Sequence, residues 1–167
     1  MDDQVVGPNK SSDRLILVVG YGNPLRQDDG IGQHVAKTIA DWNLPQVEAI
    51  AVHQLTPELA EYLIRAEMAI FVDACPVATS PDVSIQPLEL AESGMTSGHS
   101  CDPQSLLAMT QALYGYHPRS WWVMVPGVHF ELGECFSPIA DQGIKTALQQ
   151  IKQFIQTARR EPCMKLE

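Results

Sequence analysis

The stretch from Arg14 to Gly30, RLILVVGYGNPLRQDDG, decides the fold of this chain. It begins with a continuous aliphatic run, Arg14 to Val19, which is typical of a strand buried on both faces. The run breaks into two glycines, and residues 30–42 then follow a helical pattern, with an apolar residue at every fourth position. A strand, a glycine turn and a helix in this order predict the start of a βαβ unit.

The rest of the chain continues the alternation of strands and helices. Further strands are expected at 47–52, 68–73, 82–90 and 120–127, and helices at 57–64, 103–114 and 138–159. Pro87 predicts that the strand over 82–90 lies at an edge of the sheet. The alternation predicts a three-layer α/β sandwich, with a mostly parallel, twisted sheet and helices on both faces. We expect one domain over residues 14–160, a flexible tail over 1–13 and a second tail over 161–167.

Composition excludes several classes of protein. The 167 residues carry a formal net charge of -9 without a basic cluster, which argues against nucleic-acid binding. The apolar runs are strand-sized, far below the roughly 20 residues of a membrane span. The polar N-terminus does not resemble a signal peptide. Four scattered cysteines indicate free thiols in a reducing compartment. We therefore expect a cytoplasmic protein that binds neither nucleic acid nor membrane.

Nucleotide binding is the first alternative for the glycine turn. The dinucleotide motif needs a third glycine, but Leu25 stands at that position after Gly20 and Gly22. Asp28 and Asp29 also precede the helix N-terminus, where a pyrophosphate would bind. Two like charges about 4 Å apart repel by roughly 4 kcal/mol at an effective dielectric constant near 20. The acidic pair therefore disfavours a nucleotide.

The acidic pair suits a cation better. Helix capping accounts for one of the two acids, but capping does not require a pair. Asp73 ends the strand at 68–73, where a cap or an Asx turn remains an alternative role. Because parallel strands end at the same edge of a sheet, Asp29, Asp73 and a loop histidine, His99 or His53, are candidates to meet there. Two carboxylates and an imidazole predict a site for nickel or zinc.

Other chemistries find less support. The chain has neither the G-x-S-x-G motif of serine hydrolases nor the H-E-x-x-H motif of zinc peptidases. Cys101 lies two residues after His99, and a thiol nucleophile is the alternative that this spacing raises. Residues two apart on a loop seldom form a nucleophile–base pair, and a cysteine near a helix start is commonly inert.

Four blocks of sequence resemble one family in order and spacing. They are LVVGYGNPLRQDDGIGQHVA, AIFVDA, SGHSCDPQSLLAMTQALYG and VPG with LGECFSPIA. The chain resembles, from Leu15 to about Ile155, the hydrogenase maturation endopeptidases, which remove a short C-terminal extension from the large subunit of a [NiFe] hydrogenase. The segment HQL after the second strand is similar to members that serve bidirectional, NAD-linked hydrogenases.

The resemblance implies roles for particular residues. Asp29, Asp73 and His99 match the metal-binding trio, and Asp29 and Asp73 are the implied catalytic residues of an aspartyl endopeptidase-like site. Many members carry glutamate where this chain has Asp29. Relatives often have Asp-Gly after the second strand, whereas this chain has His53 and Gln54. The implied substrate-binding residues are His53, Gln54, Asn23 and Gly22.

The resemblance also implies where the metal comes from. Nickel already inserted in the large-subunit precursor would dock on the trio, and zinc or cadmium would occupy the same site. The metal either polarises the scissile carbonyl or a bound water, or it anchors the substrate while Asp29 or Asp73 acts as general base. The alternative is a non-catalytic nickel-dependent chaperone, although the chain lacks the His-rich or Cys-rich tracts common in metal carriers. We expect a monomer in the free state.

Overall fold

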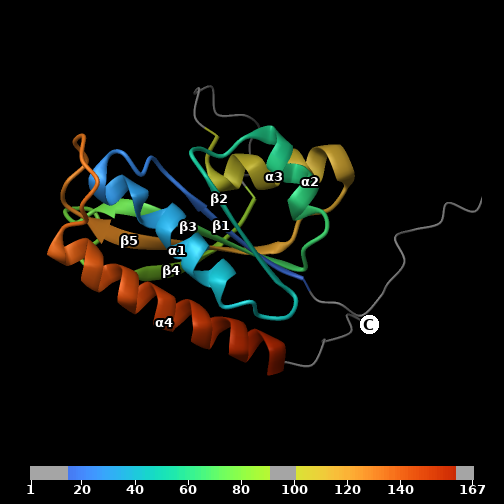
Figure 1. The fold of residues 1–167 in the computed structure, drawn as a ribbon. Helices are drawn as coiled ribbons and strands as arrows, with labels where there is room; N and C mark the ends of the chain where they lie inside the picture. Colours follow the sequence, from blue (N-terminus) through green and yellow to red (C-terminus); the bar gives the residue numbers. More distant parts are fainter. Residues whose placement is uncertain (1–14, 91–100, 161–167) are drawn as a thin grey trace, which may run out of the picture.

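A single five-stranded sheet forms the centre of the computed structural model, which describes residues 15–90 and 101–160 (Figure 1). The strand order is β2-β1-β3-β5-β4. All neighbours pair in parallel except β4 with β5. The strands are β1 (Ile16–Tyr21), β2 (Val47–Val52), β3 (Met68–Pro76), β4 (Ser84–Leu88) and β5 (Arg119–Gly127). The predicted mostly parallel α/β sandwich is confirmed.

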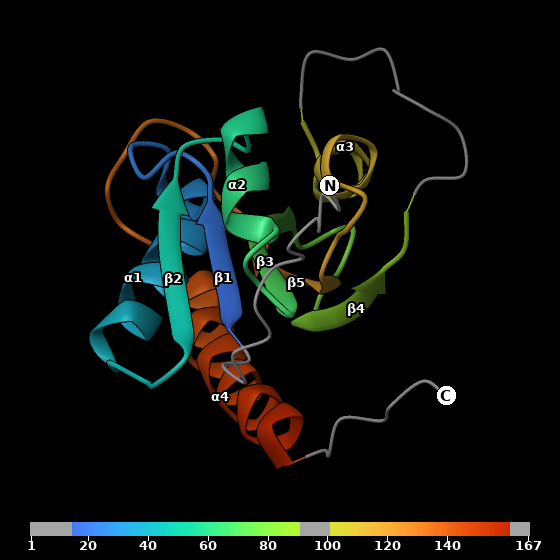
Figure 2. The same cartoon turned by 90° about the vertical axis from the view of Figure 1, so that its right-hand side faces the viewer.

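Helices cover both faces of the sheet (Figures 1 and 2). Two long helices, α1 (Ile31–Asp41) and α4 (Pro138–Arg160), pack on one face. A short helix, α2 (Ala60–Leu63), and α3 (Pro103–Tyr114) pack on the other. Single 3₁₀ turns, η1 (Gln27–Gly30) and η2 (Pro57–Leu59), precede α1 and α2. None of the helices within the described residues is long and apolar enough to cross a membrane.

The alternation of side chains along each strand produces two separate apolar cores. In β1, Ile16 and Val18 point towards α1 and α4, whereas Leu17 and Val19 point towards α2 and α3. Val18, Leu17 and Val19 are fully buried. This arrangement explains why the sequence of β1 is apolar without a break.

Several element boundaries differ from those predicted. β1 continues to Tyr21, and β3 does not end at Asp73 but continues to Pro76, because residues 74–76 pair with the last residues of β5. The predicted helix at 57–64 is a 3₁₀ turn followed by one α-helical turn. Thr56 stands at its N-cap, where threonine is a favoured residue type, but makes no capping hydrogen bond.

Other local predictions are confirmed. Asp102 caps α3, since its Oδ1 accepts a hydrogen bond from the Ser105 amide at 2.7 Å. Gly115 ends that helix in the left-handed conformation, with φ of 68°. Pro87 lies in β4, an edge strand. Ser137 caps α4, since its Oγ accepts from the Ala140 amide at 3.1 Å.

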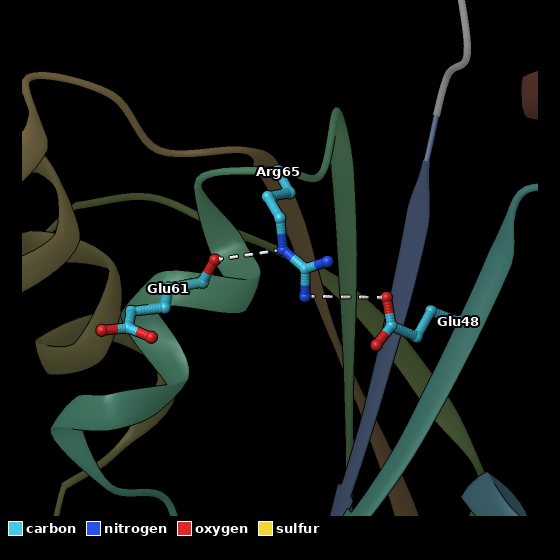
Figure 3. Close-up of polar contacts among 3 residues, drawn as sticks. All are labelled: Glu48, Glu61 and Arg65. Carbon is cyan, nitrogen blue, oxygen red and sulfur yellow. Dashed lines mark hydrogen bonds and ion pairs between the residues drawn. The ribbon is translucent and has the colours of Figure 1, made fainter.

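An exposed ionic contact ties α2 to the neighbouring edge strand (Figure 3). Arg65 follows α2, and its guanidinium lies 3.9 Å from the Glu48 carboxylate on β2 and donates to the Glu61 carbonyl at 3.4 Å. Solvent-exposed pairs of this kind contribute between about 0 and 1 kcal/mol. The contact therefore adds little to the packing of α2 on the sheet.

The strand order reverses between β1 and β3, and we refer to the carboxyl ends of these two strands as the β1–β3 crevice. The chain leaves β1 through α1 to reach β2 on one side, while β3 pairs with the other side of β1. In open α/β sheets, ligands bind at the carboxyl ends of strands where the order reverses in this way. The loop after β1 and the Asp73 side of β3 meet at this position.

Candidate active site

The loop after β1 depends on a glycine. Gly22 has a φ of +135°, and a Cβ atom there would lie 2.0 Å from the Asp29 carbonyl oxygen. The Gln33 side chain of α1 donates to the Gly22 carbonyl at 2.8 Å and is itself buried. No other residue permits this backbone conformation without strain and a clash. Gly22 therefore brings the acidic turn close against the end of β1.

A second pair of glycines brings α1 close to the sheet. A Cβ on Gly20 would lie 1.8 Å from the Gly32 carbonyl oxygen, and one on Gly32 would lie 2.4 Å from the Val72 carbonyl oxygen. The sequence argument that Leu25 leaves the chain without a glycine for close helix–strand packing needs correction, because Gly32 provides that contact. The acidic pair remains the argument against a nucleotide.

Asp29 is half-buried within η1, just before the start of α1. Its Oδ2 accepts a hydrogen bond from the Asn23 amide at 2.9 Å, and no other described residue donates to its carboxylate. The Asn23 side chain is used locally, because its Oδ1 accepts from the Leu25 amide at 3.0 Å. Asn23 therefore orients Asp29 through its backbone, while the predicted contact with substrate stays a prediction.

Asp73 lies next to the last residue of β1, on the face of the sheet covered by α2 and α3. Burial raises its pKa to about 6, and the negative charge of Asp29 acts in the same direction. Hydrogen bonds from the Tyr21 hydroxyl and the Ala74 amide partly offset this rise in pKa. Burial, followed by the charge of Asp73, holds the pKa of Tyr21 far above its usual value, so its hydroxyl stays a donor.

The charge of Asp29 reaches the Asp73 carboxylate and adds to the rise in its pKa, after the larger effect of burial. A cation close to both carboxylates would favour their ionised forms. Two carboxylates suit a divalent cation chemically, and a nitrogen donor would make the set suitable for nickel or zinc. Within residues 15–90 and 101–160 no three His, Cys, Asp or Glu side chains come together as a metal site. His99, the predicted third ligand, lies outside the described residues.

Asp28 does not share the site with its neighbour. Its side chain is fully buried and accepts hydrogen bonds from the loop between β5 and α4. The sequence argument assigned one of the two acids to helix capping, which is wrong, because neither η1 nor α1 has a side-chain cap. Asp28 therefore has a structural role, which is to anchor the loop between β5 and α4 and not to cap a helix.

Other predicted residues occupy the surroundings. His53 and Gln54 are exposed directly after β2, on the same edge of the sheet as the loop after β1. Burial and the nearby charge of Asp102 raise the pKa of the Cys101 thiol. Because the thiolate is the nucleophile, this environment disfavours the thiol alternative.

Sequence reasoning missed Tyr21 and Trp122. Tyr21 donates to Asp73, and the buried Trp122 indole N–H faces the Tyr21 hydroxyl oxygen. The period of two along β1 was the available signal, because it places Tyr21 on the same face as Leu17 and Val19. Trp122 pairs with Phe71 across β5 and β3 on that face.

A surface hollow of about 470 Å³ lies elsewhere, between α4 and the start of β4. Its lining includes Val83, Pro126 and Ile139, and none of the predicted site residues belongs to it. The acidic pair at the β1–β3 crevice has two carboxylates, whereas this hollow has a single carboxylate, that of Asp82, among mainly apolar and amide groups. We therefore place the candidate site at the crevice.

Searches for relatives by sequence gave no match, neither to a family model nor to a curated protein. Solved structures share the fold. The hydrogenase maturating endopeptidase HybD from Escherichia coli superposes with a TM-score of 0.68 at 23% identity, over 86% of this chain and 93% of that one. The [NiFe] hydrogenase maturation protease HycI from Thermococcus kodakarensis gives 0.68 at 18% identity, over 87% and 95%.

An archaeal protein extends this likeness. The hydrogenase 2 maturation peptidase from Thaumarchaeota archaeon SCGC_AB-539-E09 gives a TM-score of 0.65 at 20% identity, over 86% of this chain and 99% of that one. The chain therefore has the α/β fold of solved hydrogenase maturation peptidases along nearly its whole described length. At these identities the likeness is one of fold.

Proposed function

We propose that this protein is an endopeptidase that removes a short C-terminal extension from the nickel-loaded large-subunit precursor of a [NiFe] hydrogenase. The observation that carries the proposal is the pair Asp29 and Asp73, two carboxylates at the β1–β3 crevice, where the charge of Asp29 acts on Asp73. The fold shared with several hydrogenase maturation proteases supports it. The sequence blocks that hold both acids also resemble that family in order.

In this proposal, Asp29 and Asp73 bind the nickel that the precursor carries, and His99 is the third ligand. Asp102 acts electrostatically on Tyr21, so the start of α3 lies near the crevice. Three peptide units separate His99 from Asp102, a span of at most about 10 Å. This reach is compatible with His99 as a ligand. His53 and Gln54, exposed at the end of β2, contact the peptide.

The acid–base properties of Asp73 suit peptide hydrolysis. With a pKa of about 6, its carboxylate is mostly ionised at neutral pH yet still basic enough to accept a proton from water. Nickel held by the precursor would supply Lewis acidity at the scissile bond. Tyr21 holds the Asp73 carboxylate by its hydroxyl, and Asn23 holds that of Asp29 by its amide.

Finer assignments belong to the same proposal. The HQL segment after β2 supports a substrate of the bidirectional, NAD-linked type. We place the reaction in the cytoplasm, with the free enzyme a monomer and the substrate its source of nickel. Zinc or cadmium would occupy the same carboxylates in the absence of precursor.

Intact mass spectrometry of a [NiFe] hydrogenase large-subunit precursor tests the function directly. Nickel-loaded and nickel-free precursors are incubated with the protein, with Asp73→Ala as the control. We expect a discrete loss of a C-terminal peptide from the nickel-loaded precursor alone, and no loss with the variant. An unchanged mass despite stable association would instead indicate the chaperone alternative.

A further inference from the structure

The two adjacent acids of the loop after β1 occupy opposite environments. Asp28 is fully buried, whereas Asp29 is half-buried beside the crevice. A buried carboxylate needs hydrogen-bond donors, since an unpaired charge away from water is costly. The donors for Asp28 come from residues about 100 positions later in the chain.

Four hydrogen bonds reach the Asp28 carboxylate. Its Oδ2 accepts from the Val128 amide at 2.8 Å, the His129 amide at 3.0 Å and the Ser137 hydroxyl at 2.7 Å. Its Oδ1 accepts from the Ser137 amide at 2.8 Å. Burial by itself raises the pKa of Asp28, but these donors hold it below its ordinary value, so the group is ionised at neutral pH.

Backbone contacts fasten the same two segments together. The Asp28 amide donates to the His129 carbonyl at 2.9 Å, and the Gln27 amide donates to the Gly133 carbonyl at 2.9 Å. The Gly133 amide donates in return to the Leu25 carbonyl at 2.9 Å. The acidic turn is therefore held along its length by the loop that joins β5 to α4.

Asp29 has few restraints of its own. One of its carboxylate oxygens accepts from Asn23, and its amide donates to the Arg26 carbonyl at 3.1 Å. Its orientation therefore depends on the backbone of the turn, which the contacts of Gln27 and Asp28 with the β5–α4 loop hold in place.

We propose that Asp28 is a positioning residue, whose buried carboxylate fixes the β5–α4 loop under the acidic turn and thereby directs Asp29 at Asp73. The inference rests on the proposed function, because it assigns the two acids to one nickel-recognising site. It makes residues 128–137 part of the site although none of them contacts the metal. In this proposal Asp28 positions the turn, and Asp29 binds the metal.

The test compares Asp28→Asn with wild-type protein and with Ile151→Ala. The asparagine keeps the shape, but its NH₂ group faces at least one of the backbone amides that now bind an oxygen, so the loop loses its anchor. Ile151 is buried between α4 and the sheet, far along the chain from the crevice, and serves as a control that loses stability without touching the site.

Two readouts separate positioning from simple stability. Nickel binding to the free protein is measured by calorimetric titration with Ni²⁺, and kcat and KM are measured on the nickel-loaded precursor, both well below each variant's Tm. We expect Asp28→Asn to lose about 10- to 100-fold in nickel affinity and in kcat/KM. We expect Ile151→Ala to match wild type in both, even at an equal loss of Tm.

The outcomes are distinguishable from failure of the proposed function. A wild-type protein that cuts no precursor refutes the peptidase, while its nickel titration still decides the role of Asp28. A wild-type protein that cuts, beside an Asp28→Asn variant of equal nickel affinity and equal kcat/KM, refutes the positioning role alone. If Asp28→Asn does not fold, Ser137→Ala removes one of the four donors, and its expected result is a smaller loss in both readouts; no loss relative to Ile151→Ala overturns the proposal.

Discussion

The two faces of the sheet are built differently. The face under α1 and α4 is closed by two long helices, and its core is mainly apolar, with side chains such as Ile70 and Ile151 almost fully buried. The face under α2 and α3 is covered by a single-turn helix and a three-turn helix, and at its upper edge it holds Tyr21, Asp73 and Trp122.

This difference separates stability from chemistry. The first face buries mainly apolar area, which is the main source of folding free energy. The second face accepts a half-buried carboxylate with a raised pKa, which costs stability and suits the proposed general base. Substitutions on the first face should therefore mainly lower Tm, and substitutions on the second face should mainly lower turnover.

Asp73→Asn should give the largest effect on activity. We expect kcat/KM on nickel-loaded precursor to fall by about 10²- to 10⁴-fold, the usual contribution of a general base. Because burial raises the pKa of Asp73 from 3.8 to about 6, the folded state holds this proton more tightly than the unfolded state, and wild-type stability falls as pH rises through that window.

The same variant should therefore be more stable than wild type at pH 8, by up to about 3 kcal/mol, with no gain at pH 3.5. Thermal unfolding at the two pH values measures this. Recovery of the wild-type rate at saturating precursor would show instead that Asp73 only anchors the substrate.

Ile151→Ala probes the apolar face. Removing a fully buried side chain between α4 and the sheet should cost about 2–5 kcal/mol of unfolding free energy. For a domain of this size that corresponds to a fall in Tm of about 5–15 °C. Precursor cleavage at 20 °C should keep its wild-type kcat; a large fall in kcat at unchanged fold would contradict the separation of the two faces.

The pH dependence of metal binding sharpens the comparison on the other face. Asp73 must lose its proton to bind a cation, so nickel affinity of the free protein should rise about tenfold per pH unit below 6 and level off above 7. Calorimetric titrations with Ni²⁺ between pH 5 and 8 measure this. Asp73→Asn is the control, in which the rise of nickel affinity between pH 5 and 7 should disappear. A wild-type affinity that does not change with pH would show that the pKa of Asp73 lies outside this range.

Tyr21→Phe should give the smallest effect. It removes one oxygen and keeps the ring that packs against the α2–α3 core. Loss of the hydrogen bond to the Asp73 carboxylate should destabilise that carboxylate by about 1.5–3 kcal/mol, and a water molecule that takes the place of the hydroxyl would restore part of this. The pKa of Asp73 should therefore rise further. Carboxyl-carbon NMR titration of Asp73 follows this; an unchanged titration would show that the hydroxyl does not hold the charge.

The sequence was sufficient for the fold because its signals are local. Apolar runs and caps predicted β2 with its observed bounds and the start of α3 at Asp102. Alternation of elements then restricted the topology to a mostly parallel sheet. The boundary error in β3 has a long-range cause, because Asp73 lies inside the strand through its pairing with β5, a contact about 50 residues away.

The site was less accessible because it depends on long-range contacts. Asp29 and Asp73 were identified from the strand ends and from a resemblance, and in the structure the charge of Asp29 acts on Asp73. The different environments of Asp28 and Asp29 could not be predicted, because the two neighbouring residues are identical in type. The hydrogen bond from Ser137, which is distant in sequence, accompanies the burial of Asp28, whereas Asp29 lies at the crevice.

The partnership between Asp28 and Ser137 has a consequence for biosynthesis. The two residues are 109 positions apart, so during translation the acidic turn emerges long before its donors leave the ribosome. Until then the Asp28 carboxylate lacks the donors that it needs when buried, so it stays hydrated while β1 and α1 form. The proposed site is therefore expected to form last, and a nascent or truncated chain that ends before residue 137 should lack the anchored acidic turn.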